Sequence, residues 1–313
     1  MTQEFRTHPT PYKFMGEFER MEPLILDHTS MIAAKECLRK YFFSIVLGMN
    51  PRGDPMPYFA FGSAYHKFRE VLEIEHKAAN PTPYKAALIA AVKYWGEATS
   101  GKDPQVGTKW DFLTRARLMK SCEVAFEVWQ KEKAQKKIEV LAVEQPFNVE
   151  VKSGEFTSGR FDQIVRFNEK IYGRDFKTSS KEGAFYSRGL DPNDQFTRYT
   201  YAEQKLAGQR VEGQIIEVLY NSKKEGPRVT PYIASRTQWQ LDDWEADEMF
   251  HRETLDRARE QDRWAKSEKG CTFCQFHSVC KMGSMASQVA KLKQEFTQKA
   301  WNNLTVHLLE SEK

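Results

Sequence analysis

Two short stretches decide the fold, Gly159–Asp162 (GRFD) and Gly173–Thr178 (GRDFKT). They lie in two strand-like segments, Phe156–Phe167 and Ile171–Thr178, which are separated by the polar residues Asn168–Lys170. This pattern is typical of a β-hairpin. A hairpin would bring two carboxylates and a lysine together, and such a group suits a site that binds a metal ion and cleaves phosphodiesters.

The register of this hairpin decides which side chains meet. A turn centred near Glu169 would place Asp162 opposite Phe176 and beside Asp175. Because side chains alternate along a strand, Asp175 and Lys177 should share one face, while Phe176 points into the packed side. The alternative is a solvated hairpin with ordinary surface charges. The apolar neighbours of these charges disfavour it, because burying an unpaired charge is costly.

Composition sets broad limits on the protein. The chain has 313 residues, a formal net charge of +4 and 29% charged residues, which permits nucleic-acid binding without requiring it. Its length allows one elaborated domain or two closely joined ones. No stretch approaches the ~20 apolar residues of a membrane helix, and the polar residues 1–16 lack a signal-peptide core. We therefore expect a cytoplasmic protein without a membrane partner.

The order of helix-like and strand-like segments predicts three consecutive parts. Residues 1–136 should be mainly helical, 137–235 should form a compact αβββαβ unit, and 236–313 should add helices and a cysteine-rich turn.

Three helices in this arrangement carry candidate functional residues. Ser30 is a candidate N-cap for a helix that reaches about Val46. A second helix should span about Phe61–Glu75 with an apolar stripe. Asp191 and Pro192 resemble the N-cap and first turn of a helix that runs to about Ala207.

Three of the five cysteines crowd into one segment with C-x2-C-x5-C spacing. In a cytosolic chain, such crowding favours metal binding over disulfide formation. A zinc site would satisfy this spacing, with His277 able to replace one thiolate. Cys122 lies in an amphipathic helix and should be a buried free thiol. The crowded segment contains Cys271, Cys274 and Cys280, and the fifth cysteine is Cys37.

Taken together, these motifs resemble the PD-(D/E)XK nuclease superfamily, and within it the RecB-like and Cas4-like branch. The resemblance covers roughly residues 30–280 and rests on the order and spacing of the motifs. It implies an α/β fold: a restriction-endonuclease-like αβββαβ core with a large N-terminal helical region and a C-terminal iron–sulfur segment.

The resemblance also implies a metal site and its catalytic lysine. Carboxylate oxygens suit Mg²⁺, and an added imidazole also suits Mn²⁺. The cation would activate water, and Lys177 would orient that water or offset charge on the phosphate. The histidine in question is His66, which on its own would more simply be a surface or core residue. The implied ligands are His66, Asp162, Asp175 and the carbonyl oxygen of Phe176.

Three further residues match family positions. Glu144 resembles the acidic residue of the preceding strand, where it could hold a second metal ion, orient water or pair with a lysine. Gln195 and Tyr199 resemble a Gln-x-x-x-Tyr motif that positions the nucleic-acid backbone. Because they lie four residues apart on one helix face, an ordinary packing pair is the alternative.

For the cysteines, the resemblance implies a [4Fe–4S] cluster held by Cys37, Cys271, Cys274 and Cys280. A cluster with these ligands would tie the N-terminal helices to the C-terminal region as a structural staple. Zn²⁺ is the alternative metal.

These features predict a metal-dependent DNA nuclease that acts as a single-strand exonuclease in DNA end processing, recombination or repair. The chain has no ATP-binding Gly-x-x-x-x-Gly-Lys motif, so it would act alone or with a helicase, a recombinase or a CRISPR partner. Cas4-type processing of DNA ends and an idle DNA-binding scaffold are the alternatives. An oligomer is compatible with this prediction.

Overall fold

The computed structural model describes residues 17–22, 26–53, 56–181, 183–268 and 270–301. The chain divides into two compact units, and neither is a single stretch of sequence. Unit 1 comprises residues 1–53, 150–159 and 245–313, and unit 2 comprises residues 54–149 and 160–244. The division into a helical region (1–136), a nuclease core (137–235) and C-terminal helices with the cysteine cluster (236–313) stays a prediction.

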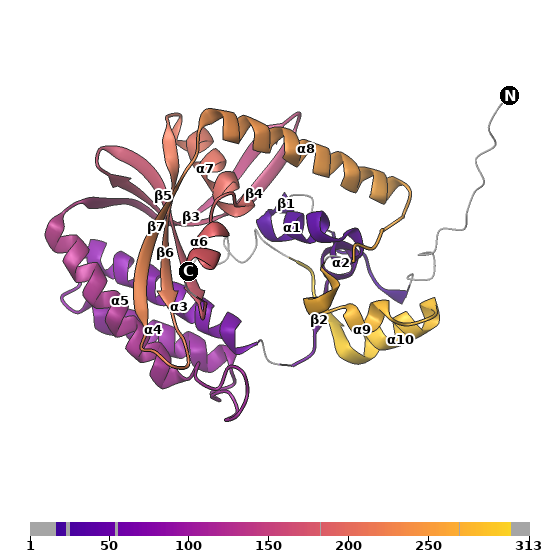
Figure 1. Ribbon diagram of the computed structural model, residues 1–313, viewed down its shortest axis with the longest axis horizontal. Coiled ribbons are helices and arrows are strands. Elements are labelled where there is room, and N and C mark those ends of the chain that lie inside the picture. Colours follow the sequence, from indigo (N-terminus) through magenta and orange to yellow (C-terminus); the bar gives the residue numbers. More distant parts are fainter. Residues whose placement is uncertain (1–16, 23–25, 54–55, 182, 269, 302–313) are drawn as a thin grey trace. The chain divides into compact units, whose positions relative to one another are not determined.

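The centre of unit 2 is a mixed β-sheet (Figure 1). Its strands pair in the order β3-β4-β5-β6-β7, with β5 and β6 parallel and the pairs β4–β5 and β6–β7 antiparallel. Helix α7 (Asp194–Ala207) makes the crossover that a parallel pair requires. The mixed α/β class is therefore confirmed. The strands are β3 (Ile138–Lys152), β4 (Glu155–Phe167), β5 (Lys170–Ser179), β6 (Val211–Tyr220) and β7 (Arg228–Ser235).

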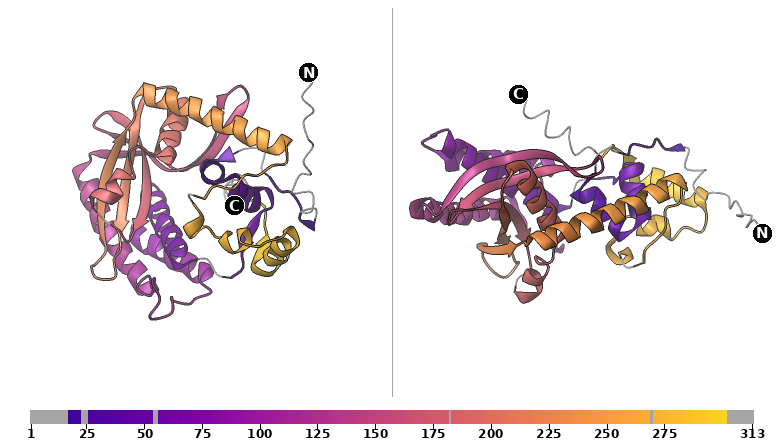
Figure 2. Two further views of the ribbon diagram at one scale, coloured as in Figure 1. Left: turned by 45° about the vertical axis from the view of Figure 1, so that its right-hand side comes forward. Right: turned by 90° about the horizontal axis from the view of Figure 1, so that it is seen from above.

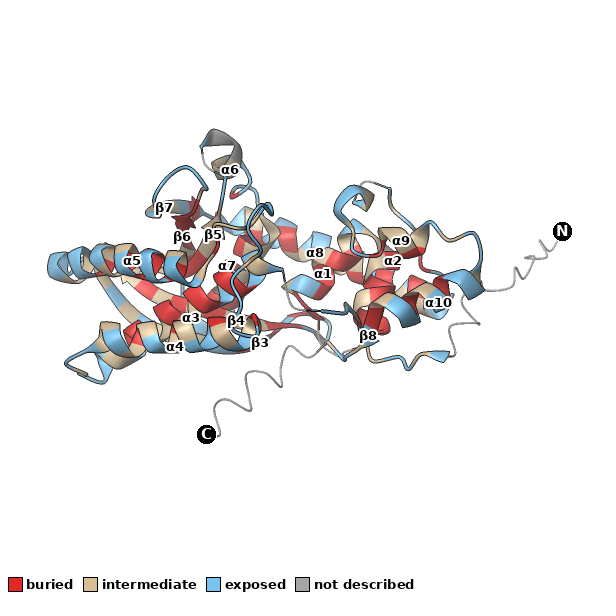
Figure 3. Cartoon of the chain, turned by 90° about the horizontal axis from the view of Figure 1, so that it is seen from below, coloured by how far each residue is buried: buried red, intermediate tan, exposed pale blue. Residues whose placement is uncertain are grey.

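One face of the sheet is covered by α3 (Pro57–Lys77), α4 (Pro83–Ala98) and α5 (Arg115–Gln135), which lie side by side (Figures 1 and 2). Their apolar stripes enclose Phe176 of β5 and Leu219 of β6. Buried residues run along α3, whereas α4 is mostly exposed or half-buried (Figure 3). The opposite face carries α7 and the short helix α6 (Ala184–Arg188).

The hairpin of β4 and β5 forms as predicted, but its register is wrong by one residue. Phe167 pairs with Lys170, so only Asn168 and Glu169 form the turn. Both adopt positive φ angles, 49° and 62°, as a two-residue type I′ turn requires. The ladder ends at Gln163 and Arg174.

Of the two helices predicted within unit 2, one is confirmed and the other begins at a different residue. The helix predicted at about Phe61–Glu75 is confirmed as α3, which is longer at both ends and has Pro57 in its first turn. The predicted start at Asp191–Pro192 is wrong, because the N-cap of α7 is Asn193, whose side chain accepts a hydrogen bond from the Phe196 N–H. The bond between Asp191 and Pro192 is a cis peptide.

Unit 1 combines short N-terminal elements with the C-terminal part of the chain. Strand β2 pairs with β8, and β1 pairs in parallel with residues 157–158 of β4. No helix of the described residues is both long and apolar enough to cross a membrane. The elements are β1 (Leu26–Asp27), α1 (His28–Glu36), α2 (Leu38–Tyr41), the π-helical turn η2 (Phe42–Val46), β2 (Met49–Pro51), α8 (Gln238–Glu260, from Glu245 onward), η3 (Cys271–Phe273), α9 (His277–Cys280), α10 (Met285–Glu295) and β8 (Phe296–Gln298).

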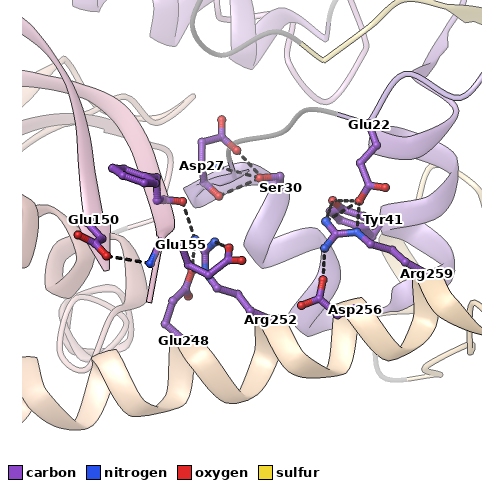
Figure 4. Close-up of polar contacts among 12 residues, drawn as sticks. Glu22, Asp27, Ser30, Tyr41, Glu150, Glu155, Glu248, Arg252, Asp256 and Arg259 are labelled. Carbon is purple, nitrogen blue, oxygen red and sulfur yellow. Dashed lines mark hydrogen bonds and ion pairs between the residues drawn. The ribbon is translucent and has the colours of Figure 1, made fainter. Parts of the chain in front are cut away.

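The single helix predicted from Ser30 to Val46 is wrong. Asp27 is the N-cap of α1, and Ser30 completes a capping box with it (Figure 4). The Asp27 carboxylate accepts from the Ser30 N–H at 2.8 Å, and the Ser30 hydroxyl accepts from the Asp27 N–H at 2.9 Å. The helix then breaks at Cys37, whose backbone is extended (φ −168°).

Two arginines of α8 secure unit 1 through buried or half-buried contacts (Figure 4). Arg252 lies 2.7 Å from the Glu155 carboxylate and donates to the Phe156 carbonyl at 2.9 Å. Arg259 pairs with Glu22 at 2.7 Å, and Glu22 also accepts from the Tyr41 hydroxyl. These contacts fix α8 to the start of β4 and to the segment before α1.

Candidate active site

The first half of the site forms where α3 meets the end of the β4–β5 ladder. The Asp162 Oδ2 atom accepts a hydrogen bond from the Phe176 N–H at 2.8 Å. The same oxygen lies 3.2 Å from Nδ1 of His66 on α3. Because the ladder has ended at Gln163 and Arg174, the Asp162 side chain continues the link between β4 and β5. His66 and Asp162 are therefore brought together as predicted.

The second half of the site lies on β5 and α7. Asp175 is 2% exposed. Lys177 Nζ donates to Asp175 Oδ1 at 3.0 Å, and Gln195 Nε2 donates to the same oxygen at 3.2 Å. The Lys177 ammonium also lies 5.7 Å from the centre of the Phe196 ring on α7. Asp175, Lys177 and Gln195 thus form one contiguous polar group.

Tyr199 lies in the aromatic packing next to this polar group. Its ring packs edge-on against Phe147 at 5.8 Å and against Phe161 at 5.5 Å. Phe161 directly precedes Asp162, so Tyr199 lies beside the site and helps to build its wall.

Glu144 occupies an unusual backbone position in β3. Its φ angle is 48°, a left-handed conformation that is uncommon for a residue with a side chain. The less exposed positions of β3 change phase here, from half-buried even-numbered residues before Glu144 to the buried Phe147, Val149 and Val151 after it. Its carboxylate lies 2.6 Å from Nε of Arg160, a partner that the sequence analysis did not identify. Burial, together with the charge of Asp162, raises the pKa of Glu144 to about 8.

The pKa values of the other groups follow from the same crowding. Burial, reinforced by Asp162 and opposed by Lys177, raises the pKa of Asp175. Burial would also raise the pKa of Asp162, but His66 and Lys177 outweigh it and lower that pKa. Burial disfavours protonated His66, yet the charge of Asp162 prevails and raises the pKa of the imidazole.

Three carboxylates, those of Glu144, Asp162 and Asp175, therefore crowd together with one imidazole, one ammonium and the Arg160 guanidinium. Asp175 Oδ2 is buried and accepts no hydrogen bond, although Lys177 Nζ lies 2.7 Å away. Hard oxygen donors with one imidazole fit Mg²⁺ or Mn²⁺. Within the described part of the chain, no three His, Cys, Asp or Glu side chains are already arranged to hold an ion.

A buried charge network surrounds the Phe176 side chain. Two guanidinium groups lie close to its ring, with Arg69 Cζ at 4.4 Å and Arg174 Cζ at 5.4 Å from its centre. Arg69 pairs with Glu217 at 3.1 Å, and Arg174 pairs with Glu217 at 2.5 Å. Glu217 is also the partner of Phe176 in the β5–β6 register. Arg69 follows His66 by three residues in α3, so this network couples both halves of the site.

The four cysteines predicted as ligands lie together in unit 1. They line one pocket with Lys40, Lys266 and His277. All four are half-buried free thiols: Cys37, Cys271, Cys274 and Cys280. The prediction that Cys122 is a buried free thiol in a helix is confirmed, since it is fully buried in α5.

The surroundings of these thiols suit thiolate ligands. The Ser267 N–H donates to Cys37 Sγ at 3.3 Å, and the Phe276 N–H donates to Cys274. Burial raises the pKa of Cys274, and the Lys40 charge opposes this effect. Burial likewise raises the pKa of Cys280, opposed by Arg39 and Lys266. Main-chain donors and cations around sulfur stabilise anionic thiolate centres, so the residues fit a thiolate-bound metal or iron–sulfur cluster.

Comparison with known proteins now identifies the class. The family model of the PD-(D/E)XK nuclease superfamily matches residues 28–281, which is most of the chain. The chain therefore belongs to the PD-(D/E)XK nuclease superfamily, whose members are nucleases that act on nucleic acids and generally use Mg²⁺ or Mn²⁺.

One solved structure agrees with the fold. A candidate exonuclease from Eubacterium rectale is 11% identical, with 89% of this chain and 95% of that chain covered and a TM-score of 0.50. At this identity the likeness shows the fold alone. The structure of SSO0001 is 12% identical over 81% of this chain and 96% of that one, with a TM-score of 0.30, too low to carry an argument. No curated protein matches the chain.

Proposed function

We propose that this protein is a metal-dependent deoxyribonuclease that acts as an exonuclease on single-stranded DNA. One observation carries the proposal: His66, Asp162, Asp175 and Lys177, from α3, β4 and β5, converge through contacts of 2.7–3.2 Å. The membership of a nuclease superfamily supports the same chemistry.

The residues would divide the work as follows. His66, Asp162, Asp175 and the Phe176 carbonyl hold the divalent cation. When bound, the cation lowers the pKa of the attacking water and offsets charge on the phosphate. Lys177, held by Asp175, orients the water or donates to the phosphoryl oxygens.

Three other residues would support the substrate and the water. Gln195, which donates to Asp175, and Tyr199, in the adjoining wall, position the DNA backbone. Glu144, whose pKa is raised by burial and by the charge of Asp162, would hold a second metal ion or orient the water.

We also propose that the cysteine pocket of unit 1 holds a [4Fe–4S] cluster. Its ligands, Cys37 on the N-terminal side and Cys271, Cys274 and Cys280 on the C-terminal side, would tie the two ends of unit 1 together. The common pocket, the N–H donors and the surrounding cations support this assignment.

Cleavage of labelled DNA tests the proposed activity. Protein purified without oxygen is mixed with Mn²⁺ and end-labelled linear strands, closed circular strands or blunt duplex. The linear single strand should be degraded, and the circle should persist because it has no end. Lys177→Ala should slow cleavage by about a hundred- to a thousandfold.

A matched lysine provides the control. Lys120 on α5 is exposed and pairs with Glu123, so Lys120→Ala should leave the rate unchanged. A folded, metal-loaded wild type that cuts none of these substrates would contradict the proposal. Equal rates for Lys177→Ala and Lys120→Ala would show that the assigned lysine is wrong.

A further inference from the structure

A cluster of aromatic side chains lies at the start of α3. Phe59 is 60% exposed and Tyr58 36% exposed, with their ring centres 4.3 Å apart. Trp110, from the segment between α4 and α5, lies 5.2 Å from Tyr58, and Lys109 Nζ lies 4.6 Å from the Trp110 ring centre. Single exposed apolar residues are common, but a group of touching rings on the surface usually marks a binding site.

This aromatic cluster is anchored at the end of the sheet where the catalytic strand ends. Gly62 of α3 lies so close to β5 that an added Cβ would be 3.2 Å from Thr178 Oγ1. The segment that carries Trp110 is fixed to the loop that follows β6, because Asp111 pairs with Lys223 at 2.8 Å. Both anchors lie within unit 2.

The helix connects the cluster to the candidate active site. Phe59, Ser63 and His66 follow one another at i, i+4 and i+7, so they lie on one face of α3, and each is exposed or half-buried. Seven residues of helix span about 10 Å. That length corresponds to roughly three stacked nucleotides at about 3.4 Å each.

We propose that Phe59, Tyr58 and Trp110 form a platform on which unpaired bases stack, up to about three nucleotides from the bond that is cut. The inference rests on the proposed nuclease function and adds the contact that selects single strands. Stacking requires a free base face, which a paired duplex does not offer along its length. Lys109 adds a positive charge for the phosphate backbone.

Binding measured without cleavage tests the platform directly. Fluorescence anisotropy is recorded with a labelled single strand and protein carrying Lys177→Ala, so that the DNA stays intact. Adding Phe59→Ala should weaken binding by about five- to 150-fold, and Phe59→Trp should restore most of it. Phe250→Ala is the matched control, because Phe250 is 64% exposed and lies in unit 1, outside the platform.

Strands with abasic sites identify what the platform contacts. Removing the bases at the first three positions should weaken binding to protein that retains Phe59. Removing these bases should cause little further loss of binding to protein that carries Phe59→Ala, because the same stacking contact is already lost. Unchanged binding after Phe59→Ala, or an equal loss for intact and abasic strands, would overturn the platform.

The two proposals fail in different ways. In otherwise unmodified protein, Phe59→Ala should raise KM for linear single strands and leave kcat within about twofold of wild type. Cleavage with no change in KM would reject the platform and leave the nuclease standing. Base-dependent binding without any cleavage by the wild type would reject the nuclease and support the platform.

Discussion

Phe176 connects the buried charge network of unit 2 to the candidate site. Its N–H donates to Asp162, and its ring contacts the guanidinium groups of Arg69 and Arg174. Stacking of an arginine on an aromatic ring contributes about 0.5–2 kcal/mol, depending on solvation. Both contacts restrict the strand segment whose carbonyl we assign to the metal ion.

Replacing Arg69 tests the role of this network. Arg69→Met preserves length but leaves Glu217 buried with one fewer cation. Loss of one partner from a buried pair typically costs 3–5 kcal/mol, and we expect about 3 kcal/mol because Arg174 still pairs with Glu217. The free energy of unfolding in urea measures the change.

An exposed pair gives the comparison for that measurement. Lys120→Met disrupts only the surface contact with Glu123 and should not change the urea midpoint detectably. If Arg69→Met unfolds at the same urea concentration as Lys120→Met, the network does not support the site.

At the residue level, the sequence predicted the polar members of the site and missed their supports. Asp162, Asp175 and Lys177 were predictable because charged residues within an apolar strand pattern require partners. His66 was predicted only from the resemblance to the nuclease superfamily. Arg69 and Glu217 could not be paired in advance, because only the β5–β6 register and the packing of α3 bring them together. The one available signal was an arginine three residues after the candidate histidine.

At the scale of elements, small irregularities decide where functional atoms lie. The two-residue turn at Asn168 and Glu169 shifts the hairpin by one position, and the left-handed Glu144 changes the phase of β3. The break at Cys37 divides a predicted helix. The periodicity of apolar residues predicted the strands and helices themselves. These local backbone angles depend on tertiary contacts, which periodicity does not encode.

The packing of α7 on the sheet leads to a prediction about pH. Glu203 of α7 is 1% exposed and accepts a hydrogen bond from Gln214 of β6 at 2.6 Å. Burial, reinforced by the charge of Asp175, raises the pKa of Glu203 well above its usual value. The folded protein therefore retains a proton that the unfolded chain releases above a pH of about 4.3. Its stability should fall as pH rises from there, by at most about 1.4 kcal/mol per pH unit from this group.

Glu203→Gln should remove this loss, because glutamine keeps the shape and the acceptor for Gln214 but does not ionise. Urea unfolding between about pH 5 and 9 should show wild type losing stability relative to the variant. Parallel stability curves would mean that Glu203 is ionised in the folded protein and that its burial does not control its pKa.

At the scale of the whole molecule, the chain forms two compact units from interleaved segments. The predicted α/β class is confirmed within unit 2, because long strands and amphipathic helices have strong periodic signals. The strand β7, which extends the sheet beyond β6, was not predicted. Its sequence, Arg228–Ser235, contains Pro231 and alternates weakly, as suits an edge strand.

The cysteine pocket gives unit 1 its own test. Cys274→Ala should lose bound iron and acid-labile sulfide and should lower the unfolding temperature, because the pocket would no longer close around a cluster. Cys122→Ala, which changes a buried thiol in unit 2, should retain the iron content of wild type. Full iron in Cys274→Ala, or zinc without sulfide in the wild type, would contradict the iron–sulfur assignment.

We assign His66, Asp162, Asp175 and Lys177 to one metal-dependent site that cuts DNA. The most direct measurement titrates Mn²⁺ into the protein and follows bound Mn²⁺ by electron paramagnetic resonance alongside cleavage of a single strand. Wild type should gain bound Mn²⁺ and activity along the same curve. Lys177→Ala should bind Mn²⁺ without cutting, and Asp175→Asn should lose both. An Asp175→Asn variant that binds Mn²⁺ and cuts DNA like wild type would contradict the account.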